Sequence, residues 1–306
     1  MRDEFYFPSK DGNTEIHTIE WKPEGEVKAV LQLSHGMVEY IKRYDEFAEF
    51  MCSHGYYVVG NDHLGHGKSV QSKSEYGFFN EKYGNACVIG DMHTLRQRTA
   101  KKYPEVSYFM LGHSMGSLAV RCYLKKYDRE LDGLIVCGCP GKNTMAPLGT
   151  ALIRMLQTTK DPHSKSRLAD SIFANMFDRP FRAENLIHAW ICSDRKVVET
   201  YNKDPLCNFT FTLNGYESLL WLMRQTYSRM GWRVRNHKLP VLFVSGASDP
   251  CLGGSAKLAQ AVGHLKKRGY AHVSSRLYPG MRHEILNEKG RFKVYQDIAH
   301  FLQRAE

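Results

Sequence analysis

The sequence predicts an α/β fold in which a mostly parallel sheet is flanked by helices. Short apolar runs bounded by turn residues recur along the chain, and stretches with helical spacing lie between them. Such alternation is typical of a parallel sheet covered on both faces. It stops after Pro140-Gly141, and the pattern up to about Lys238 is almost entirely helical. We therefore expect a core formed by residues 1–140 and 239–306, with a helical cap inserted at 141–238.

The individual elements are predicted as follows. Segment 4–23 contains the turn signal Asp11-Gly12-Asn13 and predicts an antiparallel hairpin that leads into the sheet. Buried parallel strands are predicted at five apolar runs, which are 29–33, 56–60, 107–111, 134–139 and 241–244. Two helices are predicted from residues that repeat at three to four positions, namely Leu118, Ala119, Cys122, Tyr123 and Tyr127, and then Phe292, Tyr295, Ile298 and Leu302.

The predicted cap combines apolar stripes with positive charge. Its clearest stripes are Ile172, Phe173, Met176 and Phe177, and then Leu219, Leu220, Met223 and Tyr227. Residues 141–238 hold fifteen Lys and Arg against eight Asp and Glu, so this segment carries +7 of the net charge of +10. The chain has no run of basic residues interleaved with aromatic ones, so we expect no nucleic-acid partner.

The amino-acid composition limits the classes of protein to which this chain can belong. With 42% apolar and 24% charged residues, the 306-residue chain matches an ordinary globular protein and neither a disordered nor a fibrous one. The opening MRDEFYFPSKDGNT alternates charged and aromatic residues and has no apolar run of signal-peptide length, so we expect a cytoplasmic protein. The eight cysteines show no C-x-x-C pair and are expected to be mostly buried free thiols. Cys137 and Cys139 would share one face of the strand predicted at 134–139.

The chain contains one G-x-S-x-G sequence, Gly112-His113-Ser114-Met115-Gly116. A predicted strand precedes it and a predicted helix follows, which would place Ser114 on the tight turn that a serine nucleophile requires. The backbone N–H of Met115 would begin the helix and favour an oxyanion there. The alternative is a glycine-rich turn without chemistry.

A serine nucleophile needs a general base and an acid that orients it. His283 lies in the loop before the last helix, and Asp249 follows the strand predicted at 241–244. The order Ser, Asp, His along the chain is typical of this chemistry on an α/β sheet. Taken singly, His283 also fits a surface loop, and Asp249 fits a turn before Pro250.

Two loops near the predicted sheet edge have further candidates. Ser34-His35-Gly36-Met37 follows the strand predicted at 29–33, and we expect the backbone N–H of Met37 to be the second oxyanion donor. His35 and Gly36 are expected to be structural. Asp62, His63 and His66 have a spacing that metal ligands use, but a serine mechanism needs no metal, so we predict none.

Five segments together resemble a known group of proteins. HGMVEYIKRY, GNDHLGHGKS, GHSMGS, SGASDP and YPGMRHEILNE are similar, in this order, to the monoacylglycerol lipase and lysophospholipase group of α/β-hydrolases, sometimes catalogued with serine aminopeptidases. The resemblance covers about 29–140 and 239–305. It implies the α/β-hydrolase fold, the Ser114–His283–Asp249 triad and ester hydrolysis without a cofactor. Tyr40 and Cys251 stand where that group often has histidine and valine.

The expected function is hydrolysis of the carboxylic esters of monoacyl lipids. A short-chain carboxylesterase, an acyltransferase, a carbon–carbon hydrolase and a non-catalytic binding protein remain alternatives. A serine aminopeptidase would need acidic cap residues such as Glu184, Glu199 and Glu217 to hold an amine. A dehalogenase is disfavoured, because its nucleophile would be an aspartate at position 114.

The cap stripes admit two interpretations. They either only pack the cap onto the sheet or also line an acyl pocket, for which flexible methionines are suited: Met155, Met176, Met223 and Met230. The basic surface predicts weak association with an anionic membrane surface. The sequence carries no signal for an oligomeric state.

Overall fold

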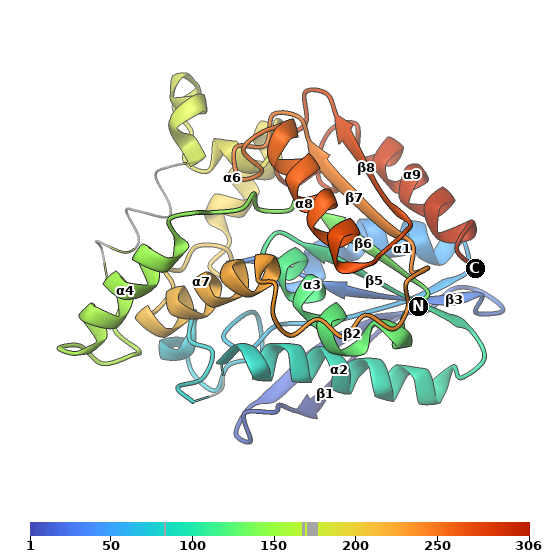
Figure 1. Ribbon diagram of the computed structural model, residues 1–306, viewed down its shortest axis with the longest axis horizontal. Coiled ribbons are helices and arrows are strands. Elements are labelled where there is room, and N and C mark those ends of the chain that lie inside the picture. Colours follow the sequence, from blue (N-terminus) through green and yellow to red (C-terminus); the bar gives the residue numbers. More distant parts are fainter. Residues whose placement is uncertain (83, 167–168, 170–176) are drawn as a thin grey trace.

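The computed structural model describes residues 1–82, 84–166, 169 and 177–306. An eight-stranded sheet with the order β1-β2-β4-β3-β5-β6-β7-β8 forms its centre (Figure 1). The strands are β1 Arg2–Pro8, β2 Glu15–Trp21, β3 Ala29–Ser34, β4 Tyr56–Asn61, β5 Ser107–His113, β6 Gly133–Cys137, β7 Val241–Gly246 and β8 Val273–Tyr278. β2 pairs antiparallel with β1 and β4, and all other neighbours are parallel. The predicted α/β fold with a mostly parallel sheet is confirmed.

Helices cover both faces of the sheet. The helices of the core are α1 Asp45–Ser53, α2 Gly84–Lys102, α3 Met115–Tyr127, α8 Ser255–Arg268 and α9 Arg291–Gln303. Side chains of α1 and α9 share one buried cluster, whereas those of α2, α3 and α8 belong to another. Every residue of β3, β4, β6 and β7 is buried, as expected for strands with helices on both sides.

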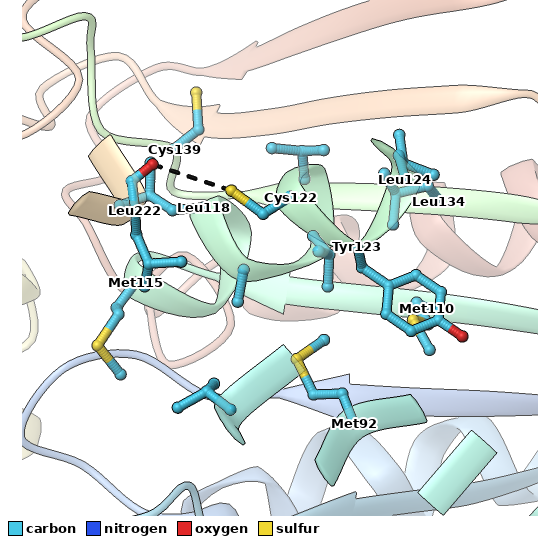
Figure 2. Close-up of a cluster of buried hydrophobic side chains, with 14 of the residues drawn as sticks. Met92, Met110, Met115, Leu118, Cys122, Tyr123, Leu124, Leu134, Cys139 and Leu222 are labelled. Atoms are coloured by element: carbon cyan, nitrogen blue, oxygen red, sulfur yellow. Dashed lines mark hydrogen bonds between the residues drawn. The ribbon is translucent and has the colours of Figure 1, made fainter. Parts of the chain in front are cut away.

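The core layer on the α2 and α3 side positions the site. Figure 2 shows Met92 of α2, Met110 of β5 and Tyr123 of α3, which belong to one buried hydrophobic cluster. Cys122 of α3 points to the opposite side of that helix, where its Sγ lies 4.0 Å from the carbonyl oxygen of Leu222. Helix α3 is therefore held between the sheet and a helix from the segment predicted to be the cap.

The predicted elements are largely found, and one strand is shorter than predicted. The predicted hairpin at 4–23 corresponds to β1 and β2, and each of the five apolar runs coincides with a strand over most of its length. The strand predicted at 134–139 is too long, because β6 ends at Cys137 and Gly138 adopts a φ of 53°. Cys137 and Cys139 are therefore not neighbours on one strand face. All eight cysteines are free thiols, and six of them are buried.

Helices are the main regular structure between β6 and β7 in the part of that segment that the structure describes. They form α4 Ala146–Gln157, α6 Arg195–Lys203 and α7 Leu213–Tyr227, with short 3₁₀ turns η4 Arg179–Glu184 and η5 Ala189–Ile191. Helices α4 and α7 lie together at one end of the molecule, away from α9 (Figure 1). On this arrangement we propose that 141–238 is a cap. Ile172, Phe173 and Met176 of the predicted stripe lie outside the described residues.

No helix in the described part of the chain is long and apolar enough to cross a bilayer.

Candidate active site

Ser114 occupies a strained turn between β5 and α3. Its φ of 53° and ψ of −115° lie outside the regions that residues other than glycine ordinarily adopt. A Cβ at position 112 would lie 2.4 Å from the carbonyl oxygen of Gly116, and one at position 116 would lie 2.0 Å from that of Ser34. Both flanking glycines are thus required by close backbone approach, which gives the G-x-S-x-G pattern a steric cause.

His283 and Asp249 meet Ser114 in a continuous hydrogen-bonded line. The Nε2 atom of His283 lies 2.8 Å from Ser114 Oγ, and its Nδ1 atom lies 2.9 Å from Asp249 Oδ2. Asp249 and His283 are both buried. With Asp249 as the acceptor of the Nδ1 proton, Nε2 is left free to accept the proton of Ser114. The line can therefore activate a serine hydroxyl.

The three side chains converge because parallel strands present their carboxyl ends at one edge of the sheet. Ser114 follows β5, Asp249 follows β7, and His283 lies in the loop after β8. The backbone N–H of Ser248 donates to the carbonyl oxygen of Met281 at 3.0 Å and joins the last two loops. A Cβ at Gly246 would lie 2.1 Å from the carbonyl oxygen of Arg282, so these loops approach as closely as glycine allows.

The loop after β3 faces the nucleophile. Met37 and Met115 line the same cavity as Ser114, as expected of residues whose backbone N–H groups serve an oxyanion hole. His35 holds the loop, because its Nδ1 donates to the carbonyl oxygen of Gly36 at 2.8 Å and its Nε2 accepts from the N–H of His63 at 2.8 Å. Val38 has a φ of 54°, which is costly for a β-branched residue. Strain thus occurs on both sides of the proposed oxyanion site.

The cavity above Ser114 has a volume of about 930 Å³. Its apolar lining comes largely from the proposed cap and includes Leu148, Leu152, Phe177, Ile187, Trp190, Leu219, Leu220 and Met223. The ring of Trp190 lies 4.7 Å from that of His283, centre to centre. Of the four methionines considered for an acyl pocket, Met223 lines the cavity, Met155 and Met230 are exposed, and Met176 lies outside the described residues.

The carboxylates suggested for binding an amine are engaged elsewhere. Glu184 pairs with Arg282, Glu199 pairs with Arg195, and Glu217 pairs with Arg154. None of these three glutamates lines the cavity.

Two other carboxylates do line the cavity, Glu39 and Glu284, and both are bound by Arg43. Within the described residues, therefore, no unpaired carboxylate of the cavity wall is available to a substrate ammonium group.

The residues with metal-like spacing have other partners. Asp62 accepts hydrogen bonds from the N–H of Ile41 at 2.8 Å and from His17 Nδ1 at 2.7 Å. Burial alone would raise the pKa of Asp62, but the hydrogen bonds from His17 and from the backbone N–H of Lys68 lower it. His63 and His66 pack against His35. Across the described chain, Asp249, Cys251 and His283 are the only group of three side chains of metal-ligating type that lie close together. Asp249 and His283 already hydrogen-bond to each other in the chain of contacts that ends at Ser114.

Sequence patterns did not indicate the buried charged network behind the site. Glu39, Arg43, His113 and Glu284 contact one another there through hydrogen bonds and ion pairs. All four residues lie in the segments that carry the family resemblance, HGMVEYIKRY, GHSMGS and YPGMRHEILNE. That shared location was the one signal available in the sequence.

Comparisons with known proteins extend over nearly the whole chain. A family described as "Serine aminopeptidase, S33" matches residues 25–290. The chain is 40% identical over 281 residues to the monoglyceride lipase homolog of Monkeypox virus, which covers 92% of this chain and 91% of that protein. It is 26% identical over 303 residues to the monoacylglycerol lipase of Mycolicibacterium smegmatis, covering 98% and 97%. A thermostable carboxyl esterase from Bacillus coagulans has a similar structure, with a TM-score of 0.91, 26% identity, and coverage of 99% and 98%.

Proposed function

Because this chain belongs to the family described as "Serine aminopeptidase, S33", we propose that it is a serine hydrolase that cleaves carboxylic esters of monoacyl lipids, monoacylglycerol or lysophospholipid. The observation that carries the proposal is the placement of the Ser114–His283–Asp249 line at the base of a large, mainly apolar cavity. Two relatives named as a monoacylglycerol lipase and a monoglyceride lipase homolog support the same substrate class.

The reaction proceeds by acyl transfer to water through an acyl-enzyme. Ser114 Oγ attacks the ester carbonyl carbon while His283 Nε2 accepts the hydroxyl proton. Asp249 stabilises the imidazolium that forms, and the N–H groups of Met37 and Met115 bind the tetrahedral oxyanion. His283 then protonates the leaving alcohol, and a water molecule activated by the same histidine releases the fatty acid.

An ester fits this cavity better than an aminoacyl amide. An amino terminus is cationic near neutral pH and needs a carboxylate or carbonyl partner when it is buried. The acidic groups on the described cavity wall are already paired with Arg43. The apolar lining instead suits an acyl chain.

The acyl-chain preference provides a first test. Each buried methylene contributes up to about 0.8 kcal/mol, so extending the chain from butanoyl to octanoyl is expected to raise kcat/KM by on the order of 10². The measurement is kcat/KM over a series of monoacylglycerols and matched aryl esters, with aminoacyl amides included. Met223→Trp should reduce the preference for octanoyl, because Met223 lines the cavity.

The matched control for this test is Met230→Trp, since Met230 is 80% exposed and does not line the cavity. A kcat/KM that declined steadily beyond butanoyl would indicate a short-chain carboxylesterase. Faster cleavage of an aminoacyl amide than of any ester would indicate a peptidase.

The mouth of the cavity has an exposed apolar surface on α4. Met145, Leu148 and Met155 on or next to this helix are each at least 60% exposed. Ile187, which lies between η4 and η5, is exposed to a similar extent. Met145, Leu148 and Ile187 also line the cavity. Since the cap is net positive as well, we propose that this face, formed by Met145, Leu148, Met155 and Ile187, rests on an anionic lipid surface.

Vesicle binding tests this proposal. The protein is expected to co-sediment with vesicles of phosphatidylcholine containing phosphatidylserine, and binding should weaken as salt screens the attraction. Met155→Asp should reduce the bound fraction, because it places a negative charge on the docking face. Phe292→Asp is the control, because Phe292 is an exposed apolar residue on α9 outside the cap. Equal binding to neutral and anionic vesicles, unaffected by Met155→Asp, would contradict the proposal.

A further inference from the structure

His113, the residue before the nucleophile, lies between two hydrogen-bond acceptors and is buried. Its Nε2 atom lies 3.3 Å from the carbonyl oxygen of His283, and its Nδ1 atom lies 3.0 Å from Glu39 Oε1. A carbonyl oxygen can only accept a hydrogen bond. The Nε2 atom of His113 must therefore carry a proton.

Glu39 is held in its ionised form. Its Oε1 atom also accepts from the N–H of Gly36 at 2.5 Å and from the hydroxyl of Tyr44 at 3.1 Å, and its Oε2 atom accepts from Arg43 at 3.0 Å. Burial alone would raise the pKa of Glu39, but the His113 hydrogen bond and the charges of His113 and Arg43 hold it well below its ordinary value. An ionised carboxylate only accepts hydrogen bonds, so Nδ1 of His113 is also a donor.

We propose that His113 is a buried imidazolium that acts as a positioning residue for the serine hydrolase reaction. The inference rests on the proposed function. One ring nitrogen binds the backbone of the catalytic His283, and the other binds the carboxylate that holds Gly36, next to Met37. The imidazolium thereby joins the nucleophile turn, the oxyanion loop and the histidine loop.

The surrounding charges compensate this cation. Arg43 binds both oxygens of Glu284 at 2.8 and 2.7 Å, so two cations and two carboxylates share the network. A buried charge is tolerated when it is paired and hydrogen-bonded in this way. Burial lowers the pKa of His113, but the Glu39 hydrogen bond and the charges of Glu39 and Glu284 raise it above the ordinary histidine value.

The other titratable groups around His113 are neutral or belong to the triad. Burial raises the pKa of Tyr44 on η1 (Ile41–Tyr44) and of Cys137 at the end of β6, so neither carries charge near neutral pH. Burial also lowers the pKa of His35, which stays neutral. The ring of His283 lies 4.9 Å from that of His113, centre to centre.

The pH dependence follows from the raised pKa of His113. A histidine whose pKa is higher in the folded state contributes stabilisation that is complete below its unfolded pKa of about 6.5 and is lost as pH rises through the folded value. Loss of the Nε2 proton would leave two acceptors facing each other, at His113 and at the His283 carbonyl. We therefore expect kcat to fall on the alkaline side as this proton dissociates.

Nuclear magnetic resonance of ¹⁵N-histidine-labelled protein tests the protonation state directly. His113 is expected to show two ring N–H protons at neutral pH, and His113→Asn assigns its signals. His35 is the matched control, because it is equally buried but donates at Nδ1 and accepts at Nε2, so it should show one. A single ring proton on His113 would overturn the proposal. The measurement does not depend on turnover, so a failure of the proposed function would be seen separately.

Kinetics test the positioning role. The amide nitrogen of His113→Asn can replace Nδ1, and that of His113→Gln can replace Nε2, but neither amide titrates or carries charge. In both variants kcat is expected to fall by up to about 10²-fold with little change in KM. The decrease of kcat at alkaline pH that we assign to His113 should also be absent from their pH profiles. His93→Asn, in α2, is the control and should keep the wild-type profile. A wild-type kcat and alkaline limb in either folded His113 variant would refute the positioning role.

Discussion

Replacing Ser114 by alanine is expected to abolish labelling by a fluorophosphonate probe and to lower kcat by on the order of 10⁴ to 10⁶. The side chain is the one that the His283–Asp249 pair can activate, since His283 Nε2 lies 2.8 Å from its hydroxyl oxygen. Its strained backbone directs that hydroxyl into the cavity. Intact-mass measurement of the labelled protein should show one adduct per chain for the wild type and none for Ser114→Ala.

The control for the labelling experiment is Ser74→Ala, because Ser74 is exposed on η2 (Lys73–Glu75) and does not line the cavity. This variant should label and turn over as the wild type does. Stoichiometric labelling of Ser114→Ala would assign the nucleophile to another residue. Absence of labelling in folded wild-type protein would favour a binding protein on the same fold.

The central strands of the fold were predictable, because strands that are buried on both faces consist almost entirely of apolar residues. The central strands β3, β4, β6 and β7 are buried along their full length, so each appears in the sequence as an apolar run. Strand β8 lies at the sheet edge and has several exposed polar positions, so it gave no such run. The end of β6 was misplaced because the run continues past Gly138, where a positive φ turns the chain away.

The candidate triad was predictable because parallel strands impose a common location. Ser114, Asp249 and His283 each follow a strand, and the structure brings them within hydrogen-bonding distance. The catalytic roles of these residues stay predictions, as do those of Met37 and Met115. The network around His113 has no comparable signal, because Glu39 and His283 lie 74 and 170 residues away from it in the sequence. Such contacts depend on loop conformations, which hydrophobic periodicity does not encode.

Replacing Asp249 by asparagine is expected to lower kcat by about 10⁴ while the fold is retained. The carboxylate accepts the Nδ1 proton of His283 at 2.9 Å, which leaves Nε2 able to take the proton of Ser114. An asparagine amide can instead donate to Nδ1 and stabilise the opposite tautomer, whose Nε2 proton faces the serine hydroxyl. The base is then unavailable, although every atom of the site remains close to its position.

The matched control for this effect is Asp45→Asn, since Asp45 pairs with Arg2 on the surface and does not line the cavity. It should change kcat by less than about twofold, as expected for an exposed ion pair. A loss below about tenfold in Asp249→Asn would show that another carboxylate orients His283. Glu39 and Glu284 are the acidic residues on the described cavity wall, and both are bound by Arg43. Because both carboxylates are engaged by Arg43, neither is expected to replace Asp249 as the partner of His283. We therefore expect the full loss in kcat.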